Sequence, residues 1–315
     1  MSSPLSPQLP SSLTAAAMSS SAALQAVPAP APMWHSKLRR FLGDHGLALG
    51  TAVLVLIVLT ALFAPWLAPH DPYSQDVTQR LIPPVWHANG SWLHALGTDK
   101  LGRDYLSRLI FGARVSLLIG FSAALISGLI GSTLGVLAGY FGGRVDAVIS
   151  YIITTRLAMP VVLVALAVAS LAGGSLKVVI VLLGLLLWDR FAVVTRSATQ
   201  QLRDAEFIAS AQVLGASTPY ILLREILPNI MSALIVVATL EMAHAILLEA
   251  TLSFLGLGVQ PPTPSWGLMV AEGKAYMFFQ PWVILIPGIA LILLVLAINL
   301  VGDGLRDMNA PDGRN

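Results

Sequence analysis

The sequence predicts an all-α integral membrane protein with about six transmembrane helices. Hydrophobic residues make up 56% of its 315 residues and charged residues only 11%, whereas soluble domains carry about 25% charge. Uncharged or nearly uncharged runs long enough to cross a bilayer recur along the chain. The absence of cysteine excludes disulfides and thiolate metal sites, and a net charge of +2 is too small to indicate nucleic-acid binding.

The first part of the chain changes from a polar tail to an apolar helix. Residues 1–33 carry no charge and are rich in Ser, Ala and Pro, which is typical of a disordered tail. They lack the basic start and apolar core of a signal peptide. A basic cluster over residues 37–40 then precedes an uncharged run over residues 46–69. Residues 34–69 are therefore predicted to form a cytoplasmic lead-in and the first transmembrane helix.

Residues 70–113 are polar and irregular, with prolines and glycines that exclude one continuous helix. We expect an extracytoplasmic loop here, long enough to suggest a function of its own. Near its end, Asp104 is able to cap the helix that follows. Three arginines would then lie on a solvated face of that helix: Arg103, Arg108 and Arg114.

Five further spans are predicted to form a core over residues 114–305, and the first of them covers residues 115–143. This span carries two rows of small residues at four-residue spacing, one at Ser127, Gly131, Gly135 and Gly139, the other at Gly120, Ala124, Gly128 and Ser132. Small residues at this spacing let helix backbones approach closely in lipid. We therefore expect neighbouring helices on two sides of this span.

The third and fourth spans, over residues 146–171 and 176–197, contain charges. The third should kink or break at Pro160. Arg156 and Asp189 lie at similar depth, counted from the cytoplasmic ends of their helices. Because a charge within a membrane is costly and usually paired, we expect an ion pair between these two residues.

The fifth span, over residues 228–254, contains three ionisable residues: Glu241, His244 and Glu249. Glu241 and His244 are three residues apart and so share a helix face. Ionisable groups in a membrane suggest a function, such as lining a water-filled translocation pathway, where a carboxylate would be able to meet a cationic group. Interhelical hydrogen bonding is the alternative for each of the three.

Residues 256–280 are expected to form a second extracytoplasmic loop, in which Pro261–Pro264 exclude a helix. Aromatic side chains near its end fit an interfacial belt: Tyr276, Phe278, Phe279 and Trp282. An uncharged sixth span over residues 281–302 and a C-terminal tail over residues 306–315 complete the chain. Six spans place both termini in the cytoplasm.

A polar, amphipathic segment, DAEFIASAQVLGASTPYILLREILPN, lies between the fourth and fifth spans at Asp204–Asn229. Its acidic start suits a helix N-terminus, and Gly215 suits a turn. Pro219 and Pro228 each suit the first turn of a new helix. These features predict two short helices joined at residues 215–218, able to dock into a groove on a soluble partner. An ordinary amphipathic surface loop is the alternative.

This segment resembles the cytoplasmic coupling loop of ABC importer permeases, known as the EAA motif. Ala209 stands where the motif has Glu, Ser210 where it has its first Ala, and Glu225 where it often has Ile. The resemblance implies a coupling loop over residues 200–227. In and beside it, the residues that would contact an ATPase are Glu206, Ala209, Ser210, Ala211, Gly215, Ala216, Leu227 and Pro228.

Four further segments resemble the dipeptide, oligopeptide and nickel branch of that family: His70–Pro72, Leu96–Ser116, Glu249–Gly267 and Asn299–Pro311. The resemblance runs from about Trp34 to the C-terminus. It implies the fold of a type I ABC importer permease, in the bacterial inner membrane and in the position of the second permease subunit. It also implies di- or oligopeptide cargo, a second homologous permease, two ATPase subunits that bind ATP and Mg²⁺, and an extracytoplasmic peptide-binding protein.

The chain lacks a phosphate-binding loop of the G-x-x-x-x-G-K-[ST] type, and it contains neither H-E-x-x-H nor G-x-S-x-G. We therefore expect it to bind no cofactor and to catalyse no reaction itself. One alternative is the same type of importer with nickel chelate, glutathione or peptide antibiotic cargo. Another is a stand-alone proton-coupled transporter that uses Glu241, His244 and Glu249 as a relay.

Overall fold

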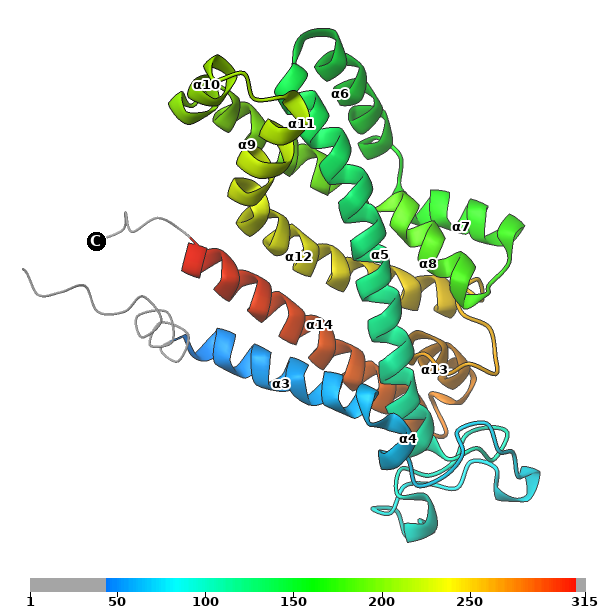
Figure 1. Ribbon diagram of the computed structural model, residues 1–315. Coiled ribbons are helices and arrows are strands. Elements are labelled where there is room, and N and C mark those ends of the chain that lie inside the picture. The colour runs from blue at the N-terminus through cyan, green and yellow to red at the C-terminus, as the bar shows by residue number, and fades with distance from the viewer. Residues whose placement is uncertain (1–43, 310–315) are drawn as a thin grey trace, which may run out of the picture. The chain divides into compact units, whose positions relative to one another are not determined.

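A computed structural model describes residues 44–309, and within this range the chain consists of helices and connecting loops (Figure 1). Five helices are long and apolar enough to cross a membrane, and a sharply bent pair makes a sixth span if it crosses as one. The expected all-α membrane fold is thus present. The predicted disordered tail, the basic cluster at residues 37–40 and the last residues of the C-terminal tail lie outside the described residues.

The first span is α3 (His45–Leu62), followed by the short α4 (Ala64–Leu67). Asp44 caps α3, because its Oδ1 accepts hydrogen bonds from the backbone N–H groups of Gly46 and Leu47. α3 lies along α14 (Trp282–Asn309), near the two ends of the described chain (Figure 1).

The 37-residue helix α5 (Tyr105–Phe141) packs against α3, α8, α9 and α12. Asp104 caps it through a hydrogen bond from the N–H of Ser107 to the Asp104 carboxylate, as expected. The helix starts inside the segment predicted to be loop, however, so the loop ends at residue 104 rather than 113. The charges around its start belong to a buried network described below, not to a solvated surface.

Both rows of small residues on α5 lie against neighbours, as their spacing predicts. A Cβ added at Gly139 would lie 2.7 Å from the carbonyl oxygen of Arg196 in α9 (Asp189–Arg203), and one at Gly135 would overlap Thr195 of the same helix. On the other row, Gly120 faces Ile246 of α12 (Leu227–Phe254). Glycine is needed here because the helix backbones approach too closely for a side chain.

Two spans are broken. α6 (Gly143–Leu157) and α7 (Val161–Ala172) meet at 83°, and Pro160 lies in the gap, as predicted. The second break, between α8 (Leu176–Leu186) and α9, is milder, because the two helices still form one span. It falls at residues 187–188, where neither proline nor glycine stands. Each break leaves helix-end carbonyl and N–H groups without intrahelical partners.

The predicted pair of short helices is only half correct. α10 (Glu206–Val213) forms, but α11 (Thr218–Tyr220) continues through a π-helical turn, η3 (Ile221–Ile226), into α12 without a break. The N–H of Leu227 bonds to the carbonyl of Leu222, five residues earlier. Pro228 follows this wide turn, which accommodates a residue that has no N–H to donate. Pro228 therefore stands in the first turn of α12, as predicted, although η3 runs into α12 without a break.

The second predicted loop contains a helix, α13 (Trp266–Gly273), which Ser265 caps. The prolines at 261–264 precede it, so they exclude a helix only locally. The expected aromatic belt is wrong for Trp282, which is buried edge-on against Tyr105 with ring centroids 5.4 Å apart. Phe278 and Phe279 are exposed, as a belt requires.

Candidate functional site

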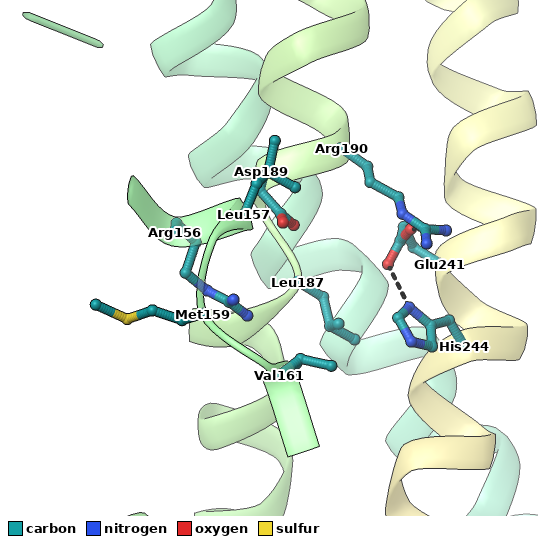
Figure 2. A pocket seen from close by; sticks show the side chains of 9 residues that line it. All are labelled: Arg156, Leu157, Met159, Val161, Leu187, Asp189, Arg190, Glu241 and His244. Atoms are coloured by element: carbon teal, nitrogen blue, oxygen red, sulfur yellow. Dashed lines mark hydrogen bonds and ion pairs between the residues drawn. The ribbon is translucent and has the colours of Figure 1, made fainter. Parts of the chain in front are cut away.

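A polar cavity of about 250 Å³ lies where the two broken spans meet α12 (Figure 2). The α6–α7 break and the α8–α9 break supply most of its wall, and α12 supplies the rest. Nine residues line it: Arg156, Leu157, Met159, Val161, Leu187, Asp189, Arg190, Glu241 and His244. Five of these nine side chains are ionisable, which is costly in a membrane and marks the cavity as the candidate site.

The α8–α9 break explains how Arg156 is held. Its Nη2 donates a hydrogen bond to the carbonyl oxygen of Leu186, the last residue of α8. That carbonyl belongs to the negative end of a helix dipole, which favours a cation. Asp189 stands in the first turn of α9, where the dipole favours an acid. Arg156 therefore lies at the C-terminal end of α8, and Asp189 at the N-terminal end of α9, where each charge is favoured by the helix dipole.

The ion pair expected between Arg156 and Asp189 is not formed among the residues that the structure describes. Both side chains line the same cavity, as their similar depth suggested (Figure 2). Arg156 bonds to the Leu186 carbonyl instead. The broken helix offers Arg156 a backbone partner that the sequence did not reveal, because no breaker residue marks that break.

The charge pair that does form joins Arg190 of α9 to Glu241 of α12, with 3.1 Å between Nη1 and Oε1. His244 lies one turn from Glu241, with Nδ1 3.4 Å from Oε2 (Figure 2). Arg190 is 58% exposed and Glu241 only 1%. Glu241 Oε1 accepts no aligned hydrogen bond from a described residue, so this carboxylate retains acceptor capacity.

The third expected pathway residue, Glu249, lies elsewhere. Its side chain is fully buried, and its Oε1 accepts hydrogen bonds from the hydroxyls of Ser253 and Ser265 at 2.8 and 2.9 Å. Because Ser265 also caps α13, Glu249 fastens that helix to α12. The structure thus brings Glu241 and His244 to the cavity and gives Glu249 the interhelical hydrogen bonds named as its alternative.

A second group of buried charges forms a network apart from the cavity. Arg103 Nε lies 2.6 Å from Asp99 Oδ2, and Arg108 lies 3.0 Å from Asp99 and 2.7 Å from Glu272 of α13. Burial raises the pKa of Glu272, although Arg103 and Lys100 offset part of that rise. The expectation that Arg103 and Arg108 are solvated is therefore wrong. They join the loop before α5 to α13.

The segment expected to couple to an ATPase has one anchored and one open side. Ile208 of α10 is fully buried against Ile221, Ile226 and Ile230. Just after the helix, the chain turns at Gly215, whose φ of +81° strongly favours glycine, and a Cβ there would meet nothing within 4 Å. Of the expected coupling residues, some are exposed and some partly buried: Glu206, Ala209, Ser210, Gly215 and Pro228 in the first group, Ala211, Ala216 and Leu227 in the second.

Sequence reasoning missed the exposed apolar tip of α10. Val213 and Leu214 are 88% and 87% exposed at its C-terminal end. Apolar residues are common around the glycine that ends a helix, so the sequence did not single out this pair as exposed. Only the position of Ile208 in the structure shows which side of α10 faces the bundle.

Comparison with known families gives two matches. The family described as "Binding-protein-dependent transport system inner membrane component" matches residues 131–314, and the "N-terminal TM domain of oligopeptide transport permease C" matches residues 32–84. A chain of the inward-facing MetNI methionine ABC transporter has a similar fold, with a TM-score of 0.55, 18% identity, and coverage of 65% of this chain and 98% of that one. The fold is that of a type I ABC importer permease.

Several curated relatives extend over most of the chain. A di/tripeptide transport system permease from Pseudomonas aeruginosa is 42% identical, over 91% of this chain and 94% of its own. A dipeptide permease from Haemophilus influenzae is 38% identical, over 86% and 92%. A glutathione transport permease from Escherichia coli is 41% identical, over 92% and 96%. The chain therefore belongs to the inner-membrane permease components of binding-protein-dependent transport systems.

Proposed function

We propose that this chain is one of two permease subunits in an ATP-driven importer that carries di- or oligopeptides across the bacterial inner membrane. The names of its di/tripeptide and dipeptide relatives support this cargo. The complex would contain a second homologous permease, two ATPase subunits that hold ATP and Mg²⁺, and an extracytoplasmic peptide-binding protein. Both termini and α10 would then face the cytoplasm, and residues 70–104 would face the binding protein.

The observation that carries the proposal is α10 itself. One side is fixed to the bundle through Ile208, while Val213 and Leu214 project from its end. An apolar helix tip held on a rigid support suits insertion into a groove on a soluble protein. In an importer permease that protein is an ATPase subunit.

The helices on either side of α10 connect it to the cavity. α9 begins with Asp189 and Arg190 in the cavity wall and ends just before α10 (Figure 1). α12 follows η3, which packs on Ile208, and carries Glu241 into the same cavity. When closure of the ATPase dimer displaces α10, both helices would move. The Arg190–Glu241 pair spans these two helices and would open or close with that motion.

The cavity offers charges of both signs to a peptide. The cations are Arg156 and Arg190, the carboxylates are Asp189 and Glu241, and His244 lies among them. A peptide has an ammonium group at one end and a carboxylate at the other, so it would be able to exchange ion pairs with this set during passage. Such transient exchange favours transport over tight binding.

Replacement of Gly215 tests the coupling proposal. A Gly215→Leu variant forces a side chain into a left-handed backbone conformation but causes no clash, so the bundle should still insert and assemble. In the reconstituted complex we expect ATP hydrolysis to lose its stimulation by peptide-loaded binding protein, and uptake to fall at least about tenfold. Gly173→Leu is the matched control, because Gly173 has a φ of +82° and similarly open surroundings in the α7–α8 turn. Equal uptake by the two variants would refute the coupling role.

The glutathione relative makes glutathione a second candidate cargo. Glutathione is also a short peptide, so the cavity does not discriminate between the two. Transport assays with the partner binding protein, loaded with either dipeptide or glutathione, would decide. Uptake driven by a pH gradient in vesicles that contain this chain alone would instead support the stand-alone transporter.

A further inference from the structure

Three side chains from separate parts of the chain converge beside the start of α5. His70 follows α4, His94 lies in the middle of the loop, and Asp104 caps α5. One nitrogen of each histidine and one oxygen of Asp104 lie within 4.8 Å of one another. His94 and Asp104 are buried, and the His70 side chain is 34% exposed. This cluster is separate from the cavity and from the Arg103–Glu272 network.

Hydrogen bonds around the cluster fix which atoms face inward. Asp104 Oδ2 is occupied by the N–H and hydroxyl of Ser107, at 2.8 and 2.7 Å, which leaves Oδ1 for the cluster. The backbone N–H of His70 also donates to the Ser107 hydroxyl oxygen at 3.1 Å, so Ser107 positions both residues. The orientation of Asp104 and His70 is therefore set by the first turn of α5.

A chain of side chains from Asp76 sets the tautomer of His94. Gln79 donates its Nε2 to Asp76 Oδ2 at 3.0 Å, so its Oε1 points the other way and lies 2.8 Å from His94 Nε2. An amide oxygen only accepts, so His94 Nε2 carries the hydrogen. His94 Nδ1 is then the nitrogen with the lone pair when the ring is neutral, and it lies 2.9 Å from Asp104 Oδ1.

The cluster thus gathers electron-rich atoms, and no Lys or Arg among residues 44–309 is paired with Asp104. His94 Nδ1 faces a carboxylate oxygen, and His70 Nδ1 lies 3.7 Å from the same oxygen. His70 Nδ1 is also buried and has no hydrogen-bond partner among the described residues. A lone pair opposite a carboxylate oxygen at this distance is repulsive. A cation must balance the group, either added protons or a metal ion.

We propose that His70, His94 and Asp104 bind a divalent transition metal ion of the zinc class. Two imidazole nitrogens and one carboxylate oxygen are ligands that Zn²⁺ prefers, and a fourth position would remain for water. The Gln79 oxygen that accepts from His94 Nε2–H is the kind of outer partner that orients a metal-binding histidine. The hydrogen bonds from Gln79 to Asp76 and from His94 to Gln79 therefore hold the His94 ring in the orientation that metal binding requires.

The geometry needs only a small adjustment. Tetrahedral zinc with bonds of about 2.05 Å has ligand atoms roughly 3.4 Å apart. The His94 and His70 nitrogens lie 2.9 and 3.7 Å from Asp104 Oδ1, close to that value, and the largest separation in the group is below 4.8 Å. A shift of about 1 Å by the partly exposed His70 ring closes the difference. Bound metal would tie the end of the first span, the middle of the loop and the start of α5 together.

Metal binding is measured on the whole transporter, purified in nanodiscs through a tag without histidines. Co²⁺ is the probe, because tetrahedral Co²⁺ absorbs in the visible range, and Zn²⁺ then displaces it. His70→Asn is the test variant, because this substitution does not touch Asp104 and so leaves the cap of α5 intact. His87→Asn is the matched control on the same loop, because His87 lies outside the cluster. Subtracting the Co²⁺ signal of the His70→Asn complex from that of the wild-type complex removes the contribution of metal bound by other subunits.

We expect wild type and His87→Asn to bind one Co²⁺ more than His70→Asn, with at least about 100-fold weaker binding in that variant. Zn²⁺ should also raise the unfolding temperature of wild type and His87→Asn but not of His70→Asn, because ligand binding stabilises the folded state. A normal unfolding temperature of metal-free His70→Asn shows that the variant is folded. Equal Co²⁺ binding by His70→Asn and wild type, or no bound Co²⁺ in wild type, would overturn the proposal and leave protons as the balancing charge.

Discussion

At the scale of single residues, the cavity shows what sequence reasoning can and cannot find. Glu241 and His244 stood out because ionisable residues are rare in apolar helices and the two share a helix face. Arg190, the partner of Glu241, could not be identified from the sequence, because it lies on another helix and far away in the sequence. Pairing across helices depends on how the helices cross, which no local pattern records.

The Arg190–Glu241 pair should respond asymmetrically to loss of either partner. Arg190→Ala leaves Glu241, 1% exposed, as a buried carboxylate beside His244. Glu241→Gln instead leaves Arg190, whose side chain is 58% exposed and therefore not enclosed by the bundle. We expect the first change to destabilise the complex by about 2 kcal/mol and the second by clearly less. Thermal unfolding of the two variants and of the double variant measures this. The double variant should be more stable than Arg190→Ala, and a loss in the double variant equal to the sum of the two single losses would show that the pair is not formed.

At the scale of helices, composition and proline predicted most spans, and two of the errors lie in segments predicted to be loops. The break at Pro160 was predicted because proline disrupts a helix wherever it stands. α13 was missed because the prolines at 261–264 suggested that the whole second segment lacks a helix. The early start of α5 was missed because polar and charged residues there suggested a loop. Those charges are satisfied instead by one another, through Asp99, Arg108 and Glu272. Such long-range neutralisation is a property of the fold and not of either segment.

The α5–α9 contact gives a prediction at this scale. Gly135→Leu would place a side chain where Thr195 and the backbone of α9 already lie. Overpacking at such a close contact should destabilise the protein by about 3 kcal/mol, and displacement of α9 should also disturb the cavity. Gly288→Leu in α14 is the control, because a Cβ at Gly288 would meet no atom within 4 Å and leucine favours a helix more than glycine does. Similar thermal unfolding of the two variants would mean that α5 and α9 are not closely packed.

At the scale of the whole molecule, two helices connect the docking helix α10 to the charged cavity. α9 and α12 each have one end at α10 and carry a charged residue into the cavity. A permease needs this arrangement, because energy is supplied at a soluble partner while cargo passes through the membrane. The sequence predicted the docking segment and the polar helix separately. Their connection became visible only when η3 proved to join the docking segment to α12 without a break.

Replacing the apolar tip of α10 should detach the ATPase subunits and leave the rest of the complex intact. Val213→Asp with Leu214→Asp puts two charges where an apolar groove would receive the tip, and both positions are exposed, so the bundle itself should fold normally. We expect affinity purification of the variant from native membranes to retain the second permease but to lose most of the ATPase.

Val77→Asp is the control for that experiment, because Val77 is also an exposed apolar residue but lies in the loop before α5. Wild type and Val77→Asp should both copurify with two ATPase subunits and one further permease. Full ATPase retention by the double variant would move the docking site away from Val213 and Leu214. A wild-type chain that purifies without any ATPase would contradict the importer and favour a stand-alone transporter, in which Glu241 and His244 carry the coupling ion.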